Sequence, residues 1–319
     1  MSELYDLIII GAAAAGCSAS IYASRRQLKY AVITKDIGGE VALSGEVENW
    51  PGIIHTTGIQ LANDFEKHMK SYNPEIALGF GVEKIEQDGN THIVYAKSFS
   101  GEEKIYRTKT VIIATGIHPR ELNIPGEKKL NGRGVTYCTV CDGPLYKNKI
   151  TTTIGAGNAA LESALMLSKI SSKAYLVTKY KDSKETNGGF PRGENILIEK
   201  VKKEKNIEII YNAITTEITG DNVVQGITYK NQETGEETTV KTNGVMVHIG
   251  VIPNSSFVEK IEKDKIGQIK VNTRCETNIK GVFAAGDVTD NQYNQIVIAA
   301  GQGVTAALSA IEDINRWSE

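Results

Sequence analysis

The feature that most constrains the fold is a strand, a glycine-containing turn and a helix that follow one another at the start of the chain. Residues 7–10 form a short apolar run typical of a buried strand, and Gly11 ends it. The small side chains of residues 12–25 predict a helix, and residues 30–34 predict a second strand. This order of elements is a βαβ unit, from which nucleotide-binding domains are built.

The same arrangement occurs a second time far downstream. A strand at 151–154 leads into a turn at 155–158, a helix at 159–170 and a further strand at 174–178. Two such units so far apart predict two nucleotide-binding domains and not a solenoid array, which would repeat its unit at short intervals.

Three later segments indicate how the chain passes between these domains. Apolar strands are predicted at 111–114, 244–250 and 281–287, and a helix follows at 296–317. We expect the chain to leave the first domain after the first of these strands and to return to it after the second. The predicted fold class is α/β, with two Rossmann-like, three-layer domains, the second inserted in the first. The expected boundaries are 1–116 with 249–319 for the first domain and 117–248 for the second.

Composition narrows the class of protein. The 319 residues suit two domains, and 36 Lys+Arg against 38 Asp+Glu give a formal net charge of −2. Hydrophobic residues make up 40% and charged residues 23%, an ordinary balance for a soluble protein that excludes disordered and fibrous chains. Because there is no basic excess, neither a nucleic acid nor a membrane surface is expected as a partner.

The sequence predicts a cytoplasmic protein. Residues 1–6 contain no basic stretch, so a signal peptide is not expected, and no run approaches the roughly 18 apolar residues that span a bilayer. Of only four cysteines, Cys138 and Cys141 lie close together in the sequence. In a reducing compartment such a pair is more often catalytic or metal-binding than structural.

The turn at 11–16 is a variant of the glycine pattern that binds a dinucleotide pyrophosphate. Gly11 would make the tight turn and Gly16 would let the helix pack closely on the strand, whereas Ala13 replaces the middle glycine. The helix N-terminus would then face the pyrophosphate. Its place at the start of the chain favours FAD over a nicotinamide cofactor, the alternative being a small-residue helix that only packs on a sheet. Asp36 is a weak candidate for binding the ribose hydroxyls.

A second cofactor motif lies at 281–287, where the strand ends at Gly286 and Asp287. Asp287 could bind a ribitol hydroxyl, and the N-terminus of the following helix would face the cofactor. A chance buried strand with the same ending is the alternative. Together with the turn at 11–16 and residues 114–116, the motif predicts an FAD site in the first domain.

The centre of the chemistry is the sequence CTVCDG at 138–143. Two cysteines separated by two residues at a helix start can close a small disulfide, and the helix dipole favours the thiolate needed for exchange. Zinc needs four ligands, and because the sequence has no second CxxC or nearby CxxH, no metal is expected. Asp142 is either a general acid that protonates the departing thiolate or only a charge at the helix N-terminus.

In their order and spacing, these motifs resemble those of the low-molecular-weight thioredoxin reductases over essentially the whole chain. The cysteine pair within the second domain is the specific mark, because the larger disulfide reductases carry their redox cysteines in the first. The matching motifs are the turn at 11–16, EVENWPG at 46–52, ATG at 114–116, GRGV at 132–135, CTVCDG at 138–143, GAGNAA at 155–160 and GVFAAGD at 281–287.

The resemblance implies a relay from a donor through FAD and the Cys138/Cys141 dithiol to a disulfide of a thioredoxin-like protein. It implies that Cys141 receives electrons from FAD, that Cys138 attacks the partner and that Asp142 donates a proton. Arg133 matches a position of partner contact, and a homodimer whose domains rotate is expected. The residues expected to bind FAD are Gly11, Ala14, Ala15, Gly16, Asp36, Gly38, Gly39, Glu40, Val41, Asn49, Val82, Ala114, Thr115, Gly116, Gly286, Asp287, Asn294, Gln295 and Ile296, and those expected to bind a nicotinamide nucleotide are Gly155, Gly157 and Asn158.

The chain departs from the family where the nicotinamide nucleotide would bind. The arginines that hold the 2′-phosphate of NADPH are missing after the strand at 174–178, and no acid ends that strand to hold the ribose of NADH. Lys179, Lys181, Lys184 or Arg192 could hold the phosphate instead. NADPH is the donor implied by the resemblance, and reduced ferredoxin or NADH are the alternatives.

Other features leave the partner and even the reaction direction open. Pro144 and Leu145 replace aromatic residues of the family, so the docking surface is expected to differ. A flavin dithiol oxidase that passes electrons to oxygen would use the same cysteines, and a flavin-binding regulatory module is a further alternative. Cys17 is expected to be a core thiol, Cys275 to be incidental among polar residues, and His248 to be a hydrogen-bonded core histidine.

Overall fold

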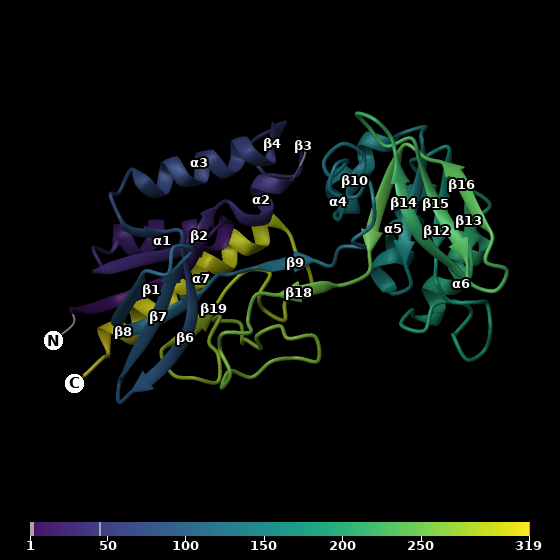
Figure 1. The fold of residues 1–319 in the computed structure, drawn as a ribbon. Helices are drawn as coiled ribbons and strands as arrows, with labels where there is room; N and C mark the ends of the chain where they lie inside the picture. The colour runs from purple at the N-terminus through teal and green to yellow at the C-terminus, as the bar shows by residue number, and fades with distance from the viewer. Residues whose placement is uncertain (1–2, 45, 319) are drawn as a thin grey trace. The chain divides into compact units, whose positions relative to one another are not determined.

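The structure is a computed structural model that describes residues 3–44 and 46–318, and it divides into two compact units (Figure 1). Unit 1 contains the chain up to His118 and from Val251 onward, and unit 2 is Pro119–Gly250. The chain therefore leaves unit 1 after His118 and re-enters it after Gly250, where the sequence predicted 116 and 248. Both units are built on largely parallel sheets, and the predicted α/β fold class is confirmed.

Unit 1 is organised around a seven-stranded sheet of order β5-β2-β1-β8-β7-β6, with β19 also paired to β8. The central strands are parallel, while β6, β7 and the outer part of β8 form an antiparallel ribbon. The bounds are β1 Leu4–Ala12, β2 Tyr30–Ile37, β5 Glu75–Leu78, β6 Phe80–Asp88, β7 Thr91–Ser98, β8 Glu103–Ile113 and β19 Val282–Ala284. Two short pairs complete the unit, β3 Glu46–Val47 with β4 Thr56–Thr57 and β9 Ile117–Pro119 with β18 Val251–Pro253.

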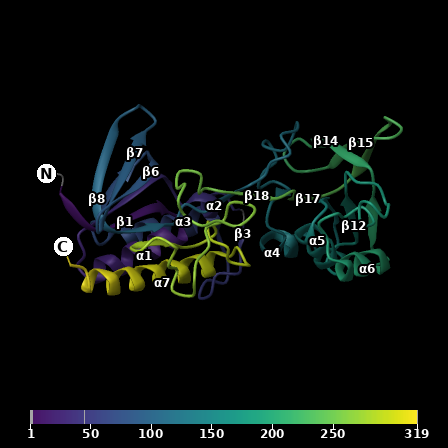
Figure 2. The ribbon, with the colours of Figure 1, turned by 90° about the horizontal axis from the view of Figure 1, so that it is seen from below.

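Both faces of this sheet are covered, which explains the continuous apolar run in β1. Ile8 and Ile10 face a cluster completed by residues 258–269, and Leu7 and Ile9 face the helices. Those helices are α1 Ala14–Arg25, α3 Gly58–Lys70 and α7 Ile296–Asn315, and a short α2 Gly39–Leu43 follows β2 (Figure 2).

Unit 2 has three layers. Its central five-stranded parallel sheet has the order β10-β17-β11-β12-β13, with α5 and α6 packed on one side and the antiparallel β14-β15-β16 sheet on the other. The strands are β10 Val135–Thr136, β11 Ile150–Gly155, β12 Lys173–Val177, β13 Ile207–Ile210, β14 Ala213–Thr219, β15 Gly226–Asn231, β16 Glu237–Lys241 and β17 Gly244–His248. The helices are α4 Thr139–Asp142, the 3-10 turn η1 Gly143–Tyr146, α5 Asn158–Ser168 and α6 Asn195–Lys203.

Helix α7 is apolar enough that its place in the fold needs explaining. With 20 residues and a mean hydropathy of 1.2, it is long and apolar enough to cross a membrane by length and composition. The sequence analysis predicted this helix but did not count it as an apolar run of membrane-spanning length, because polar residues interrupt it. In the structure its buried side is made of small residues, Gly303, Ala306, Ala307 and Ala310, and this side packs against α1.

The two free cysteines are both buried in this helical layer. Burial raises the pKa of Cys17 to about 12 and that of Cys275 to about 11, so both remain protonated thiols. The core location expected for Cys17 is confirmed. Cys275 is buried although its sequence neighbours are polar, and its thiol donates to the Gln302 carbonyl of α7 at 3.6 Å.

The contact between α1 and α7 gives a direct test of the packing. A Cβ at Gly303 would lie 2.1 Å from the Ala15 carbonyl oxygen, so Gly303→Ala must push the helices apart. We expect it to lower the free energy of unfolding by about 1–3 kcal/mol in urea titrations. Gly301→Ala is the matched control, because its Cβ would meet nothing within 4 Å, and we expect it to raise stability by about 0.5–1 kcal/mol. Equal effects of the two substitutions would contradict this packing.

Candidate functional site

The turn between β1 and α1 allows backbone approaches that only glycine permits. Gly11 has a φ of +105°, and a Cβ there would lie 2.3 Å from the Ala114 carbonyl oxygen. A Cβ on Gly16 would lie 1.9 Å from the Gly11 carbonyl oxygen. The cap residue of α1, Ala13, makes no side-chain cap bond, so the first-turn N–H groups face outward as an anion site requires.

Segments that are far apart in the sequence converge on this turn. A Cβ added to Gly286 would lie 3.1 Å from the Cβ of Ala15, and one added to Gly39 would lie 3.4 Å from the Cβ of Ala13. The α1 turn, the start of α2 and the end of β19 therefore lie side by side. Val41 is buried nearby under α3.

Two predicted flavin-contacting residues also meet directly. Asn49 Nδ2 donates to Gln295 Oε1 at 3.2 Å. Gln295 caps α7 without a side-chain cap bond, and its amide nitrogen donates to the Asn294 carbonyl at 2.9 Å. The N-terminus of α7 at Ile296 thus points its free donors toward the same region as Asn49.

Asp287 is the acidic group of this site. Burial and, to a smaller extent, the nearby Glu40 carboxylate raise the pKa of Asp287 to about 6. Its neighbour Gly286 is held by a hydrogen bond from its N–H to Gln302 Oε1 at 2.8 Å. A carboxyl group with this environment can accept a hydrogen bond from a ligand hydroxyl when charged, or donate one when protonated.

Two of the residues predicted to bind FAD, Asp36 and Val82, make other contacts in the structure. Asp36 is exposed, and its carboxylate accepts the Gly39 N–H at 3.2 Å, which orders the turn before α2. Val82 lies on β6, and its side chain packs into the apolar cluster on the sheet face opposite α1.

Two residues of unit 1, His118 and Asn254, were not among the predicted binding residues. His118 Nδ1 lies 2.7 Å from Oε1 of Glu40, which was predicted. Asn254 fastens residues 115–116, because it donates its side-chain amide to the Thr115 carbonyl at 2.8 Å and accepts the Thr115 hydroxyl on its own carbonyl at 2.7 Å. The only available signal was that residues 251–254 directly follow a predicted strand.

In unit 2 the redox pair lies at the start of α4. Cys138 and Cys141 form a disulfide, with Cα atoms 5.3 Å apart. Cys138 is the cap residue, and its Sγ accepts the Cys141 N–H at 3.3 Å. A sulfur that accepts a backbone N–H in this way is stabilised as a thiolate when the disulfide is open. The side chain of Val140, between the two cysteines, is exposed.

Asp142 is tied to this turn through Thr136. The Thr136 hydroxyl donates to the Asp142 carboxylate. The oxygen of the same Thr136 hydroxyl accepts the Cys138 N–H at 3.2 Å. Thr136 itself is buried, so it fixes the acid relative to the cysteines. Thr136 was not predicted, although it lies only two residues before Cys138, because a threonine at this spacing gave no signal of its role.

The second glycine turn also depends on close backbone contact. A Cβ at Gly155 would lie 2.3 Å from the His248 carbonyl oxygen of β17. Asn158 and Glu194 are reciprocally bonded, the Asn158 amide to Glu194 Oε1 and the Glu194 N–H to Asn158 Oδ1, both at 2.8 Å. The backbone of Arg192 pairs with that of Gly157, so the long loop returns to this turn.

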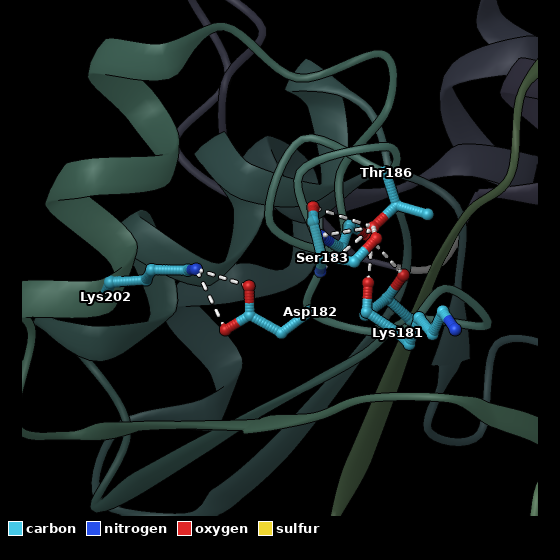
Figure 3. Close-up of polar contacts among 7 residues, drawn as sticks. Lys181, Asp182, Ser183, Thr186 and Lys202 are labelled. Carbon is cyan, nitrogen blue, oxygen red and sulfur yellow. Dashed lines mark hydrogen bonds and ion pairs between the residues drawn. The ribbon is translucent and has the colours of Figure 1, made fainter.

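The loop from 179 to 194 is ordered by its own hydrogen bonds (Figure 3). Thr186 Oγ1 donates to the Lys181 carbonyl at 2.5 Å and accepts the N–H groups of Ser183 and Gly189 at 3.3 Å. Lys202 of α6 pairs with Asp182 at 3.0 Å. Within residues 3–44 and 46–318, the cations Lys179, Lys181, Lys184 and Arg192 form no ion pair with an acid.

The comparisons with known proteins agree with this geometry. The family model described as pyridine nucleotide-disulphide oxidoreductase matches residues 5–303. The chain is 36% identical over 315 residues to "NADH dehydrogenase" of Bacillus subtilis (strain 168), covering 98% of this chain and 59% of that protein. It is also 36% identical over 315 residues to an alkyl hydroperoxide reductase protein (the F subunit) of Staphylococcus aureus (strain MRSA252), covering 98% and 60%. The chain thus spans about three-fifths of the length of these relatives.

Solved structures give the same assignment. A thioredoxin reductase from Streptococcus pyogenes MGAS5005 superimposes with a TM-score of 0.90 at 31% identity, covering 99% of this chain and 100% of that one. A ferredoxin-flavin thioredoxin reductase from Clostridium acetobutylicum gives a TM-score of 0.52 at 29% identity, covering 98% and 99%. The predicted resemblance is confirmed: the chain belongs to the pyridine nucleotide-disulphide oxidoreductase family.

Proposed function

We propose that this protein reduces the disulfide of a thioredoxin-like protein through Cys138 and Cys141, with electrons that enter by way of FAD. The observation that carries the proposal is the disulfide on the first turn of α4, with Asp142 fixed beside it by Thr136. A structural disulfide would not need an adjacent acid or the exposed position of the intervening Val140.

The chemistry follows thiol–disulfide exchange. The Cys138 thiolate attacks one sulfur of the partner disulfide, which breaks that bond and forms a mixed disulfide. Cys141 then attacks Cys138 Sγ, so that the partner leaves as a dithiol and the Cys138–Cys141 disulfide forms again. Two electrons pass to the partner in each cycle, and two protons accompany them. Asp142 is placed to hold or give one of these protons at the cysteine sulfurs.

The residues of unit 1 fit FAD. The close approaches at Gly11 and Gly16, the helix N-termini and the buried carboxyl of Asp287 would hold a pyrophosphate and a polyhydroxyl chain. When bound, FAD supplies the two-electron chemistry that connects the donor with the disulfide.

We propose NADPH as the donor. The turn at 155–158 precedes α5 as a phosphate turn should, and Arg192 lies beside Gly157. Four cations of the loop are left unpaired by acids within the described part of the chain, while Asp182 is neutralised by Lys202. These charges would favour a 2′-phosphate over a free ribose hydroxyl.

Reduced ferredoxin is the second candidate donor. Two observations favour it. The residues that follow β12 are Thr178, Lys179 and Tyr180, so no arginine pair stands there to hold a 2′-phosphate. The chain also matches the ferredoxin-flavin thioredoxin reductase along nearly its full length. The acceptor could equally be the partner of an alkyl hydroperoxide reductase system, as the name of the Staphylococcus aureus relative suggests.

We further propose that the protein is a cytoplasmic homodimer. Exposed Val297 and Leu308 on α7, and exposed Leu43 and Ile59 on α2 and α3, are apolar side chains that a second copy would cover.

The roles of the two cysteines can be separated. Cys141→Ser retains Cys138 and is expected to remain joined to a thioredoxin in a mixed disulfide, visible by non-reducing mass spectrometry, because no thiol releases it. Cys138→Ser should form no such adduct. Both should lose thioredoxin reduction on the order of 1000-fold and keep flavin bleaching by the donor. Undiminished turnover in Cys138→Ser would contradict the proposal.

The donor can be identified by anaerobic stopped-flow bleaching of the flavin with NADPH, NADH and reduced ferredoxin offered separately. Arg192→Ala is expected to raise the NADPH concentration needed for half-maximal rate about tenfold, the effect of losing about 1.4 kcal/mol of phosphate binding, and to leave NADH nearly unaffected. Arg26→Ala, at an exposed arginine after α1, is the matched control. Bleaching of the wild type by ferredoxin alone would overturn the NADPH assignment and support the second candidate.

Asp287 gives a pH signature in flavin-free protein. Its pKa rises from 3.8 to about 6 on folding, so the folded state keeps a proton that the unfolded state has lost between these values. The stability of the wild type relative to Asp287→Asn should therefore fall by about 1–3 kcal/mol as the pH rises from about 4 to 6, and stay level above it. Urea unfolding across this range measures the difference, and a constant difference would refute the assignment.

A further inference from the structure

A chain of buried hydrogen bonds lies beneath the redox turn of unit 2. Thr139 Oγ1 is 2.7 Å from His248 Nε2 and 2.7 Å from Ser163 Oγ. Ser163 Oγ is in turn 3.0 Å from Thr153 Oγ1. The chain joins four elements, since these residues belong to α4, β17, α5 and β11.

Thr139 is the anchor of the turn that carries the cysteines. It lies between Cys138 and Cys141, and it is the only residue of α4 that is buried. Helix α4 has a single turn, which is too short to be stable by its own backbone bonds. Its position therefore depends on the disulfide, on the contacts of Thr139 and on the hydrogen bond between Thr136 and Asp142.

His248 holds this anchor from the end of the central strand. Its backbone pairs with Gly155, so β17 fixes its position. Burial lowers the pKa of His248 to about 4, and a neutral ring offers one donor and one acceptor to its neighbours. The sequence expectation of a hydrogen-bonded core histidine is met, but its partner is a residue of the CxxC motif itself.

The hydrogen bonds of this chain are coupled to the redox state of the cysteines. They are present here with the disulfide closed, and the covalent link holds the turn in the conformation in which they form. Because the disulfide and the hydrogen bonds favour the same conformation of the turn, each favours the other. When the disulfide opens, the hydrogen bonds keep the two thiols in position to close it again.

We propose that His248, acting through the Thr139 hydroxyl, is a positioning residue of the redox pair and favours the disulfide over the dithiol. The proposal rests on the proposed function only in that Cys138 and Cys141 exchange between these two states. It does not depend on which donor or acceptor protein the enzyme uses.

The test is a redox equilibrium measured on the full-length, flavin-loaded protein. Wild type and variants are equilibrated anaerobically with mixtures of oxidised and reduced dithiothreitol, and the Cys138 and Cys141 thiols are quantified by alkylation and mass spectrometry. Thr139→Val keeps the side-chain shape and removes the hydroxyl, and His248→Leu removes the ring. Each is expected to raise the equilibrium constant for reduction of the disulfide about threefold to tenfold, the effect of one hydrogen bond.

Three further variants sharpen the result. Thr139→Ser, which keeps the hydroxyl, is expected to restore the wild-type equilibrium. The double variant is expected to shift it no more than the larger single effect, because both substitutions break the same contact. Thr152→Val is the matched control on β11, since Thr152 is fully buried and its hydroxyl has no hydrogen-bond partner, and it should leave the equilibrium unchanged.

The proposal is overturned if Thr139→Val and His248→Leu lower thermal stability equally in the oxidised and reduced protein while the equilibrium constant stays at the wild-type value. If His248→Leu does not fold, Thr139→Val alone decides the question. A shifted equilibrium in a protein that reduces no thioredoxin would support this proposal and refute the proposed function, so the two fail separately.

Discussion

The whole structure depends on backbone segments approaching one another more closely than any side chain would allow. In unit 1 the carbonyl of Ala114 on the β8 side approaches Gly11, and the carbonyl of Ala15 approaches Gly303. In unit 2 the carbonyl of His248 approaches Gly155. These contacts bring helix N-termini to the carboxyl ends of parallel strands, where ligands bind in folds of this kind. A methyl group at any of these glycines would not fit, so these approaches are possible only with glycine at each position.

Local sequence was sufficient for the secondary-structure units and turns, although it did not indicate the role of Thr136 beside the cysteines. The βαβ units, both glycine turns and the redox turn were predictable because each depends on residues within a short stretch, with a recognisable spacing of apolar and small side chains. The predicted helix at 296–317 differs from α7 only in where it ends. Such differences arise where the last turn of a helix lacks a specific cap.

The parts that could not be predicted are contacts between residues distant in sequence. Nothing near Asn158 indicates that Glu194 will bond to it, and nothing near Thr139 points to His248. Cys275 is a further example, because its polar sequence neighbours predicted exposure whereas α7, distant in sequence, covers it. Sheet order decides these pairings, and a single sequence carries the order of the strands only indirectly.

The strand order also has a consequence for how the chain is made. Strand β19 lies after the whole of unit 2 in the sequence, yet it pairs with β8 in the sheet of unit 1, and α7 covers that sheet from still further along. Unit 2 is one continuous stretch, so a ribosome delivers all of its strands before unit 1 has received its last strand and its longest helix. During synthesis unit 2 can therefore finish folding first, while unit 1 stays open until β19 and α7 have been made. A ligand that uses the N-terminus of α7 can bind only after that point.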